Sequence, residues 1–115
     1  MGDTTEILKE ICRLGRSSTT RSNEFSSTAP CRWNPYAIEN PETTFPFSDA
    51  SAWELICRTL DETPELFTEM KLDKPPGQIA YWTVVTLSTG VCVYIKVQLQ
   101  RGKAHGRSFH ISTKE

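Results

Sequence analysis

The most regular pattern of apolar and polar positions lies in the C-terminal third of the chain. Three runs rich in β-branched and aromatic residues, IAYWTVVTLS, VCVYIKVQLQ and AHGRSFHIST, are separated by Thr89-Gly90 and Arg101-Gly102-Lys103. Runs of this kind divided by short turns are typical of antiparallel strands joined by hairpins. Residues 79–113 are therefore predicted to form an antiparallel β-meander.

The turns also predict which side chains share a face of this meander. A two-residue turn at Thr89-Gly90 would pair Val84 with Ile95 and Trp82 with Val97. The core face is then expected to carry Ala80, Trp82, Val84, Thr86, Val93, Ile95, Val97, Leu99, Phe109 and Ile111. The opposite face is expected to carry Tyr81, Thr83, Val85, Leu87, Cys92, Tyr94, Lys96, Gln98, Ser108, His110 and Ser112.

Helical spacing of apolar residues marks two segments in the N-terminal half. In residues 3–15, Ile7, Leu8, Ile11 and Cys12 form one stripe, and Asp3 can cap the first turn. In residues 50–61 the stripe is Trp53, Ile56, Cys57 and Leu60, with Ser48 or Asp49 as the cap. A further helical turn can start at Thr63-Pro64-Glu65, and a short strand can follow it.

Two segments between the helices lack regular periodicity. Residues 16–29 include 8 Ser or Thr among 14 positions, a composition that predicts a mobile loop. Residues 30–47 hold four prolines among Trp33, Tyr36, Phe45 and Phe47, which predicts an extended segment. Its aromatic side chains could form a peptide-binding groove or pack on the protein's own core.

These elements predict an α+β fold in a single domain of residues 1–115. Two or three short N-terminal helices would pack on a C-terminal antiparallel meander of three or four strands. The 115 residues contain no apolar run long enough to span a membrane. The N-terminus also lacks the pattern of a signal peptide, so a cytoplasmic location is expected.

Charge is distributed unevenly along the chain. Residues 1–75 carry 8 basic and 13 acidic side chains, whereas residues 76–115 carry 5 basic side chains and 1 acidic one. A basic half can indicate an anionic partner, although a solvated basic strand edge that resists aggregation gives the same count. The four cysteines form no C-x-x-C pair, and no metal site or cofactor is predicted.

The polar part of the second sheet face offers chemistry for metal-independent RNA cleavage. His110 or His105 could transfer protons, and Tyr94 could donate a hydrogen bond or stack on a base. Lys96 could stabilise the charge on the reacting phosphate. Further RNA contacts are expected from Arg101, Lys103, Arg107, Lys71 and Gln98. The alternative is an ordinary half-solvated sheet face with His110 as a cross-strand neighbour.

Short motifs in the last 50 residues resemble the RelE-like bacterial toxins, in particular the MqsR branch of mRNA interferases. Tyr94-Ile95-Lys96-Val97 is similar to a Tyr-Leu-Lys strand of that branch, and Ser108-Phe109-His110 is similar to its final strand. The resemblance implies a RelE-like fold, mRNA cleavage and neutralisation by an antitoxin protein. It places Tyr94 at the catalytic tyrosine and His110 at the lysine of the final strand, while Lys71 matches the earlier catalytic lysine only with a shifted alignment.

A second hypothesis is a non-catalytic interaction or regulatory domain. Residues 16–29 and 30–47 would then make the partner contacts, with Trp33 and Tyr36 among them. The sequence gives no oligomeric state.

Overall fold

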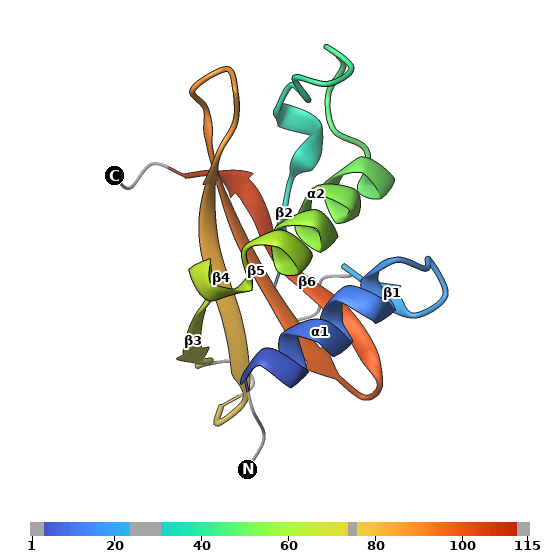
Figure 1. Ribbon diagram of the computed structural model, residues 1–115, viewed down its shortest axis with the longest axis vertical. Coiled ribbons are helices and arrows are strands. Elements are labelled where there is room, and N and C mark those ends of the chain that lie inside the picture. Colours follow the sequence, from blue (N-terminus) through green and yellow to red (C-terminus); the bar gives the residue numbers. More distant parts are fainter. Residues whose placement is uncertain (1–3, 24–30, 74–75, 113–115) are drawn as a thin grey trace.

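The computed structural model describes residues 4–23, 31–73 and 76–112. Two α-helices, α1 (Thr4–Gly15) and α2 (Asp49–Glu62), precede most of the sheet. The strands are β1 (Arg21–Ser22), β2 (Arg32–Trp33), β3 (Thr68–Lys71), β4 (Ile79–Thr86), β5 (Cys92–Gln100) and β6 (Lys103–Ile111). Two 3-10 turns, η1 (Pro35–Ala37) and η2 (Pro64–Leu66), complete the elements (Figure 1).

One mixed sheet of six strands contains all the strands of the described residues. Its order is β1-β6-β5-β4-β3, and β2 also pairs with β6. β3 to β6 are antiparallel, as the meander prediction requires, but β1 and β2 pair with β6 in parallel. The predicted fold class is therefore wrong in detail. Two α-helices pack on a mixed six-stranded sheet, not on an antiparallel meander of three or four strands.

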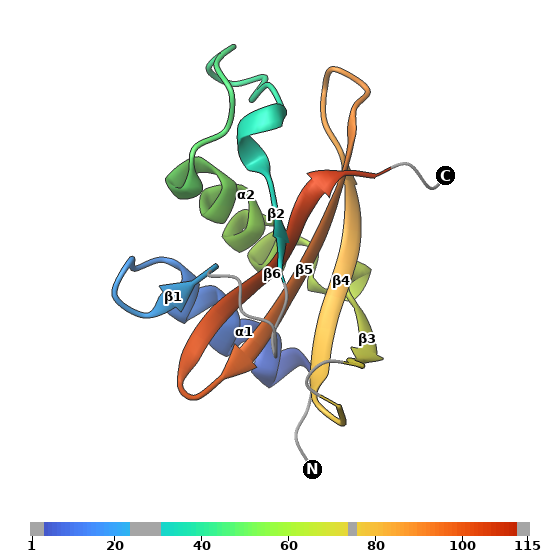
Figure 2. The same cartoon turned by 180° about the vertical axis from the view of Figure 1, so that it is seen from behind.

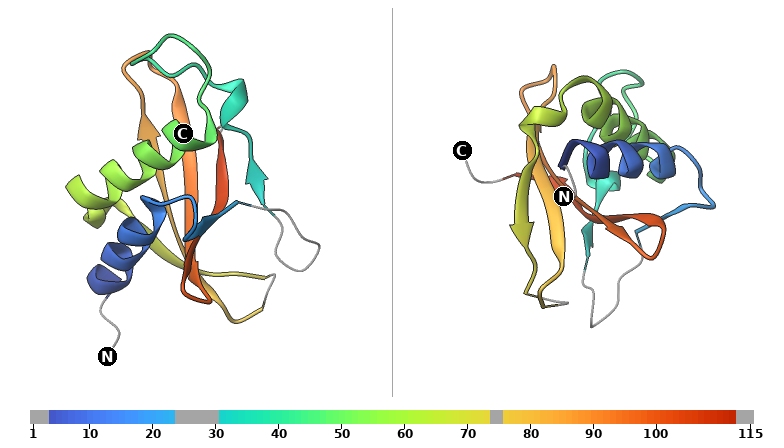
Figure 3. Two further views of the ribbon diagram at one scale, coloured as in Figure 1. Left: turned by 90° about the vertical axis from the view of Figure 1, so that its right-hand side faces the viewer. Right: turned by 60° about the horizontal axis from the view of Figure 1, so that its bottom comes forward.

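Both helices pack on the same face of the sheet, where the core forms (Figure 3). Ile11 of α1 and Trp53 and Ile56 of α2 are fully buried against Val93, Ile95, Val97 and Phe109 of the strands. The start of α2 agrees with the predicted cap, because Ser48 and Ser51 each accept a backbone N–H of the other. The predicted cap Asp3 lies outside the described residues. Neither helix is long and apolar enough to cross a membrane within the described part of the chain.

The hairpin between β4 and β5 changes the predicted register by one residue. Leu87 pairs with Val91 around a three-residue loop that ends at Gly90, which has a φ of +90°. This loop replaces the predicted two-residue turn, and a one-residue shift exchanges the two faces of a strand. The prediction for β4 is therefore wrong, whereas the faces of β5 are as predicted. Tyr81 and Thr83 lie on the core face, and Trp82 lies opposite Lys96 on the outer face.

β6 begins with a tight turn and contains a bulge. Arg101 and Gly102 both have positive φ angles, as a type I′ hairpin turn requires. The pairing then shifts between Lys96 and Val97, so that Arg107 is the extra residue on β6. Beyond the bulge Phe109 is fully buried in the core, while Ser108 and His110 pair with Lys96 and Tyr94 on the outer face, as predicted.

The segment rich in proline and aromatic residues contributes two side chains to the protein's own core. The Trp33 ring lies 5.6 Å from both Trp53 and Phe109, and its Nε1–H donates to Asp49 over 2.8 Å. Phe47 is buried against Phe109. Of the alternatives for this segment, packing on the core holds for Trp33 and Phe47. Tyr36 and Phe45 are 53% and 70% exposed.

Candidate functional site

The face of the sheet opposite the helices carries Tyr94, Lys96 and His110. Seen from behind, this outer face has no helix of the described residues in front of it (Figure 2). One row of register partners crosses five strands, from Thr68 through Trp82, Lys96 and Ser108 to Arg32. Because register partners lie side by side on one face, this row brings distant parts of the chain together.

A basic pocket opens beside this row. Its volume is about 440 Å³. Its lining comes from β2, β3, β5, β6 and the residues after β3, namely Arg32, Met70, Lys71, Leu72, Asp73, Lys96, Arg107 and Ser108. Four cationic side chains thus face one hollow together with one carboxylate. Among the described residues, Arg32, Lys71 and Lys96 form no ion pair. The pocket therefore has the charge and the donors to bind an anion.

Two basic side chains of the pocket, Lys96 and Arg107, have lowered pKa values. Burial lowers the pKa of Lys96, and the neighbouring Arg107 and Arg32 guanidinium groups lower that pKa further. The Asp73 carboxylate acts in the opposite direction. Arg107 is 2% exposed, and burial lowers its pKa as well. A bound anion would relieve this repulsion, because an opposite charge nearby favours the charged form of Lys96.

Next to the basic pocket, three rings form a stack across three strands. The Trp82 and Tyr94 rings lie 5.7 Å apart at 12°, and the Tyr94 and His110 rings lie 5.3 Å apart at 17°. Burial raises the pKa of Tyr94, so its hydroxyl stays protonated and can donate a hydrogen bond. His110 Nδ1 lies 2.9 Å from the Ile111 carbonyl oxygen. Because a carbonyl only accepts, Nδ1 carries the proton, and in the neutral ring Nε2 keeps the lone pair that a base needs.

The structure brings together only some of the predicted site residues. Tyr94, Lys96 and His110 are neighbours on the outer face, and Lys71 and Arg107 join Lys96 in the basic pocket.

The remaining predicted residues lie farther along the sheet. His105 is opposite Gln98, four residues along β5 from Tyr94, which is about 13 Å along a strand. It is buried, and its Nε2 lies 3.5 Å from Cys31 Sγ, so it does not share a site with His110. Arg101 and Lys103 are exposed at the hairpin, and Arg101 lines a pocket together with Gln98.

Arg32 and Asp73 are pocket residues that the sequence did not predict. Arg32 belongs to a two-residue strand that pairs in parallel with β6, and no periodicity marks so short a strand. Asp73 follows the edge strand β3, which is separated from β5 by β4. Its carboxylate nevertheless raises the pKa of Lys96 on β5. Within the described residues, no group of three His, Cys, Asp or Glu side chains lies close enough together to hold a metal ion.

Comparisons with protein-family models, with curated proteins and with solved structures found no match to this chain.

Proposed function

We propose that the protein binds RNA across the outer face of the sheet and cleaves the strand there without a metal ion. The observation that carries this proposal is the basic pocket around Lys96, which borders the Tyr94–His110 stack. Lys96 follows Tyr94 by two positions on β5, so the two side chains share a face about 7 Å apart. Cations that can bind a phosphate therefore lie beside a ring nitrogen that can accept a proton.

The proposed reaction is attack of a 2′-hydroxyl on the adjacent phosphate. His110 Nε2 takes the proton of the 2′-hydroxyl while its oxygen forms a bond to phosphorus. The bond from phosphorus to the 5′-oxygen breaks, and that oxygen takes a proton from Lys96, whose pKa is lowered. Arg107 stabilises the additional negative charge of the phosphorane. The products are a 2′,3′-cyclic phosphate and a free 5′-hydroxyl.

Tyr94 has a positioning role in this scheme. Its ring lies between Trp82 and His110, which fixes the plane of the imidazole. The resemblance to RelE-like toxins supports the same reaction and adds a partner, an antitoxin protein that would cover the outer face. The basic pocket makes an acidic segment the expected contact of such a partner.

Cleavage of a labelled single-stranded RNA in the presence of a chelator tests the proposal. We expect fragments ending in a 2′,3′-cyclic phosphate, and no cleavage of the 2′-deoxy strand. His110→Ala should abolish cleavage but retain binding, whereas Lys96→Met should weaken both. Lys9→Met is the matched control, because it removes the same charge from the exposed surface of α1. Absence of RNA binding in the wild-type protein would refute the proposal, and binding without cleavage would refute its catalytic part.

The second candidate is a non-catalytic interaction domain. Only one observation favours it, the exposure of Tyr36 and Phe45 on the segment between β2 and α2. Trp33 is not available for such a contact, because it packs on Trp53 and Phe109. If this candidate is right, Phe45→Ala should abolish binding of a partner protein while the triple variant Tyr94→Ala, Lys96→Ala and His110→Ala retains it.

A further inference from the structure

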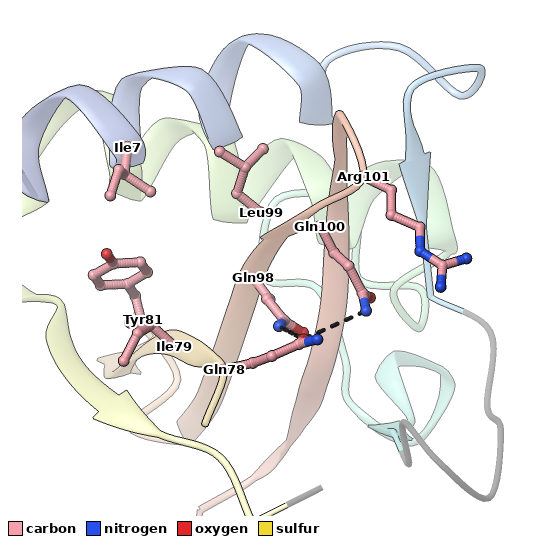
Figure 4. A pocket seen from close by; sticks show the side chains of 8 residues that line it. All are labelled: Ile7, Gln78, Ile79, Tyr81, Gln98, Leu99, Gln100 and Arg101. Carbon is pink, nitrogen blue, oxygen red and sulfur yellow. Dashed lines mark hydrogen bonds between the residues drawn. The ribbon is translucent and has the colours of Figure 1, made fainter. Parts of the chain in front are cut away.

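All three glutamines of the chain gather at one end of the sheet, two from β5 and one from the loop before β4. Gln98 Nε2 donates to Gln78 Oε1 over 2.5 Å, and Gln100 Nε2 donates to the same oxygen over 3.4 Å. Figure 4 shows the three amides converging below Leu99 and beside Arg101. From the sequence, Gln98 alone was predicted to contact RNA, and Gln78 lies 20 residues before it in the chain.

One atom of this cluster has an unused hydrogen-bonding capacity. Gln98 is 2% exposed, and its Oε1 has no hydrogen-bond partner among the described residues. A buried carbonyl oxygen without a donor costs free energy, because it loses its hydrogen bond to water. The Gln78 oxygen accepts from both other amides, so the Gln78 amide group keeps its N–H donors for another partner. The cluster therefore presents a free acceptor next to a free donor.

The glutamines line a pocket with the dimensions of a small-molecule site. Its volume is about 410 Å³, within the range of about 300–1,000 Å³ for ligand pockets. Ile7 of α1 and Leu99 of β5 provide apolar walls, and Arg101 lies at the exposed hairpin beside it. Apolar walls with a paired acceptor and donor suit a flat, polar-edged ring such as a nucleobase.

We propose that this glutamine pocket binds a nucleobase of the RNA and selects adenine. Glutamine amides pair with adenine through two hydrogen bonds, one to the exocyclic amine and one from the amide N–H to a ring nitrogen. Here Gln98 Oε1 accepts from the exocyclic amine, and Gln78 Nε2 donates to the ring nitrogen. The inference rests on the proposed RNA binding. Gln98 follows Lys96 by two positions on β5, so base and phosphate contacts would be about 7 Å apart on one strand.

Affinities for short single-stranded RNA homopolymers of adenine, uracil and cytosine, with a mixed strand for guanine, test this pocket. The wild-type protein should bind the adenine strand about tenfold more tightly than the others, which one bidentate amide–base pair can supply. Gln98→Met and Gln78→Met should each reduce this ratio to about one, because each removes one of the two hydrogen bonds to adenine. Two variants at separate positions are used so that a folding defect in one does not decide the result. Thr86→Val is the matched control, because it removes a polar group from the other end of the outer face.

The outcomes separate the two proposals. Equal binding of all four strands, preference for another base, or adenine preference retained in both variants would overturn the adenine pocket and leave RNA binding in place. Failure of the wild-type protein to bind any of the strands would refute the proposed function itself.

Discussion

Substitution of Gly106 by alanine is expected to destabilise the protein and to disturb the basic pocket. Gly106 lies on β6 next to the bulged Arg107, opposite Val97. A Cβ atom at this position would lie 2.6 Å from Cζ3 of Trp33 and 3.0 Å from Cζ2 of Trp53. The first distance is 0.8 Å shorter than the 3.4 Å at which ordinary van der Waals contacts begin. Either β6 or the Trp33 ring must therefore move.

Trp33 is poorly able to move, because its ring contacts Trp53 and Phe109 and its Nε1–H is bonded to Asp49. Extra atoms in a packed core cost about 1–3 kcal/mol, and the rigid contacts favour the upper half of this range. Movement of Trp33 also displaces its neighbour Arg32 from the basic pocket. We therefore expect Gly106→Ala to lower the free energy of unfolding by about 2 kcal/mol and to weaken phosphate binding.

Denaturation in urea measures the change in the free energy of unfolding, and a double-mutant cycle with Trp33→Leu assigns its cause. In the Trp33→Leu background the contacts with the Trp33 ring are removed and the 3.0 Å contact with Trp53 remains, so Gly106→Ala should cost less than in the wild-type background. The reasoning fails if Gly106→Ala is neutral in the wild-type background. It fails also if its cost is the same in both backgrounds, because the steric contact with Trp33 would then not be responsible.

Two other predictions concern charge and helix capping. Inorganic phosphate binding should weaken as the pH rises from about 7 towards 10, because the lowered pKa of Lys96 makes it lose its proton before an ordinary lysine does. Calorimetric titrations should show this fall in the wild-type protein and not in Lys96→Arg, and an identical pH dependence in both would contradict the assignment to Lys96. Ser48→Ala removes the side chain that accepts the Ser51 N–H at the start of α2, and it should lower the free energy of unfolding by about 1 kcal/mol in urea denaturation. An unchanged midpoint would show that the cap does not stabilise α2.

The face that a strand turns to the core was predictable from the sequence only where the burial of apolar side chains alone determined it. In β5, Val93, Ile95 and Val97 alternate with polar side chains, so the hydrophobic effect fixes the face whatever the turns do. In β4 both faces carry apolar residues, and Trp82 and Tyr81 can each be placed inside. The register then depends on the length of the hairpin loop. A single additional loop residue was sufficient to make the prediction wrong.

The short parallel strands were not predictable for a different reason. β1 and β2 have two residues each and owe their conformation to pairing with β6 and to the packing of Trp33. No local pattern contains this information, because the partners are more than 70 residues away. Arg32 could therefore be assigned to the site only from the tertiary structure. Tyr94, Lys96 and His110 could be grouped from the sequence because they lie on adjacent strands of one meander.

The uneven charge along the chain corresponds to a separation of charge between the two layers of the fold. The helices α1 and α2 carry six acidic and three basic side chains and lie on one face of the sheet. The basic pocket on the other face takes Arg32 and Lys71 from the acidic half of the sequence, and Lys96 and Arg107 from the basic half. The charge difference between residues 1–75 and 76–115 therefore does not count all the basic residues of the pocket, because two of them belong to the acidic half. In the proposed function, the acidic helical layer would repel an RNA strand and the basic pocket would attract it, which would orient the strand towards the outer face despite the net charge of −1.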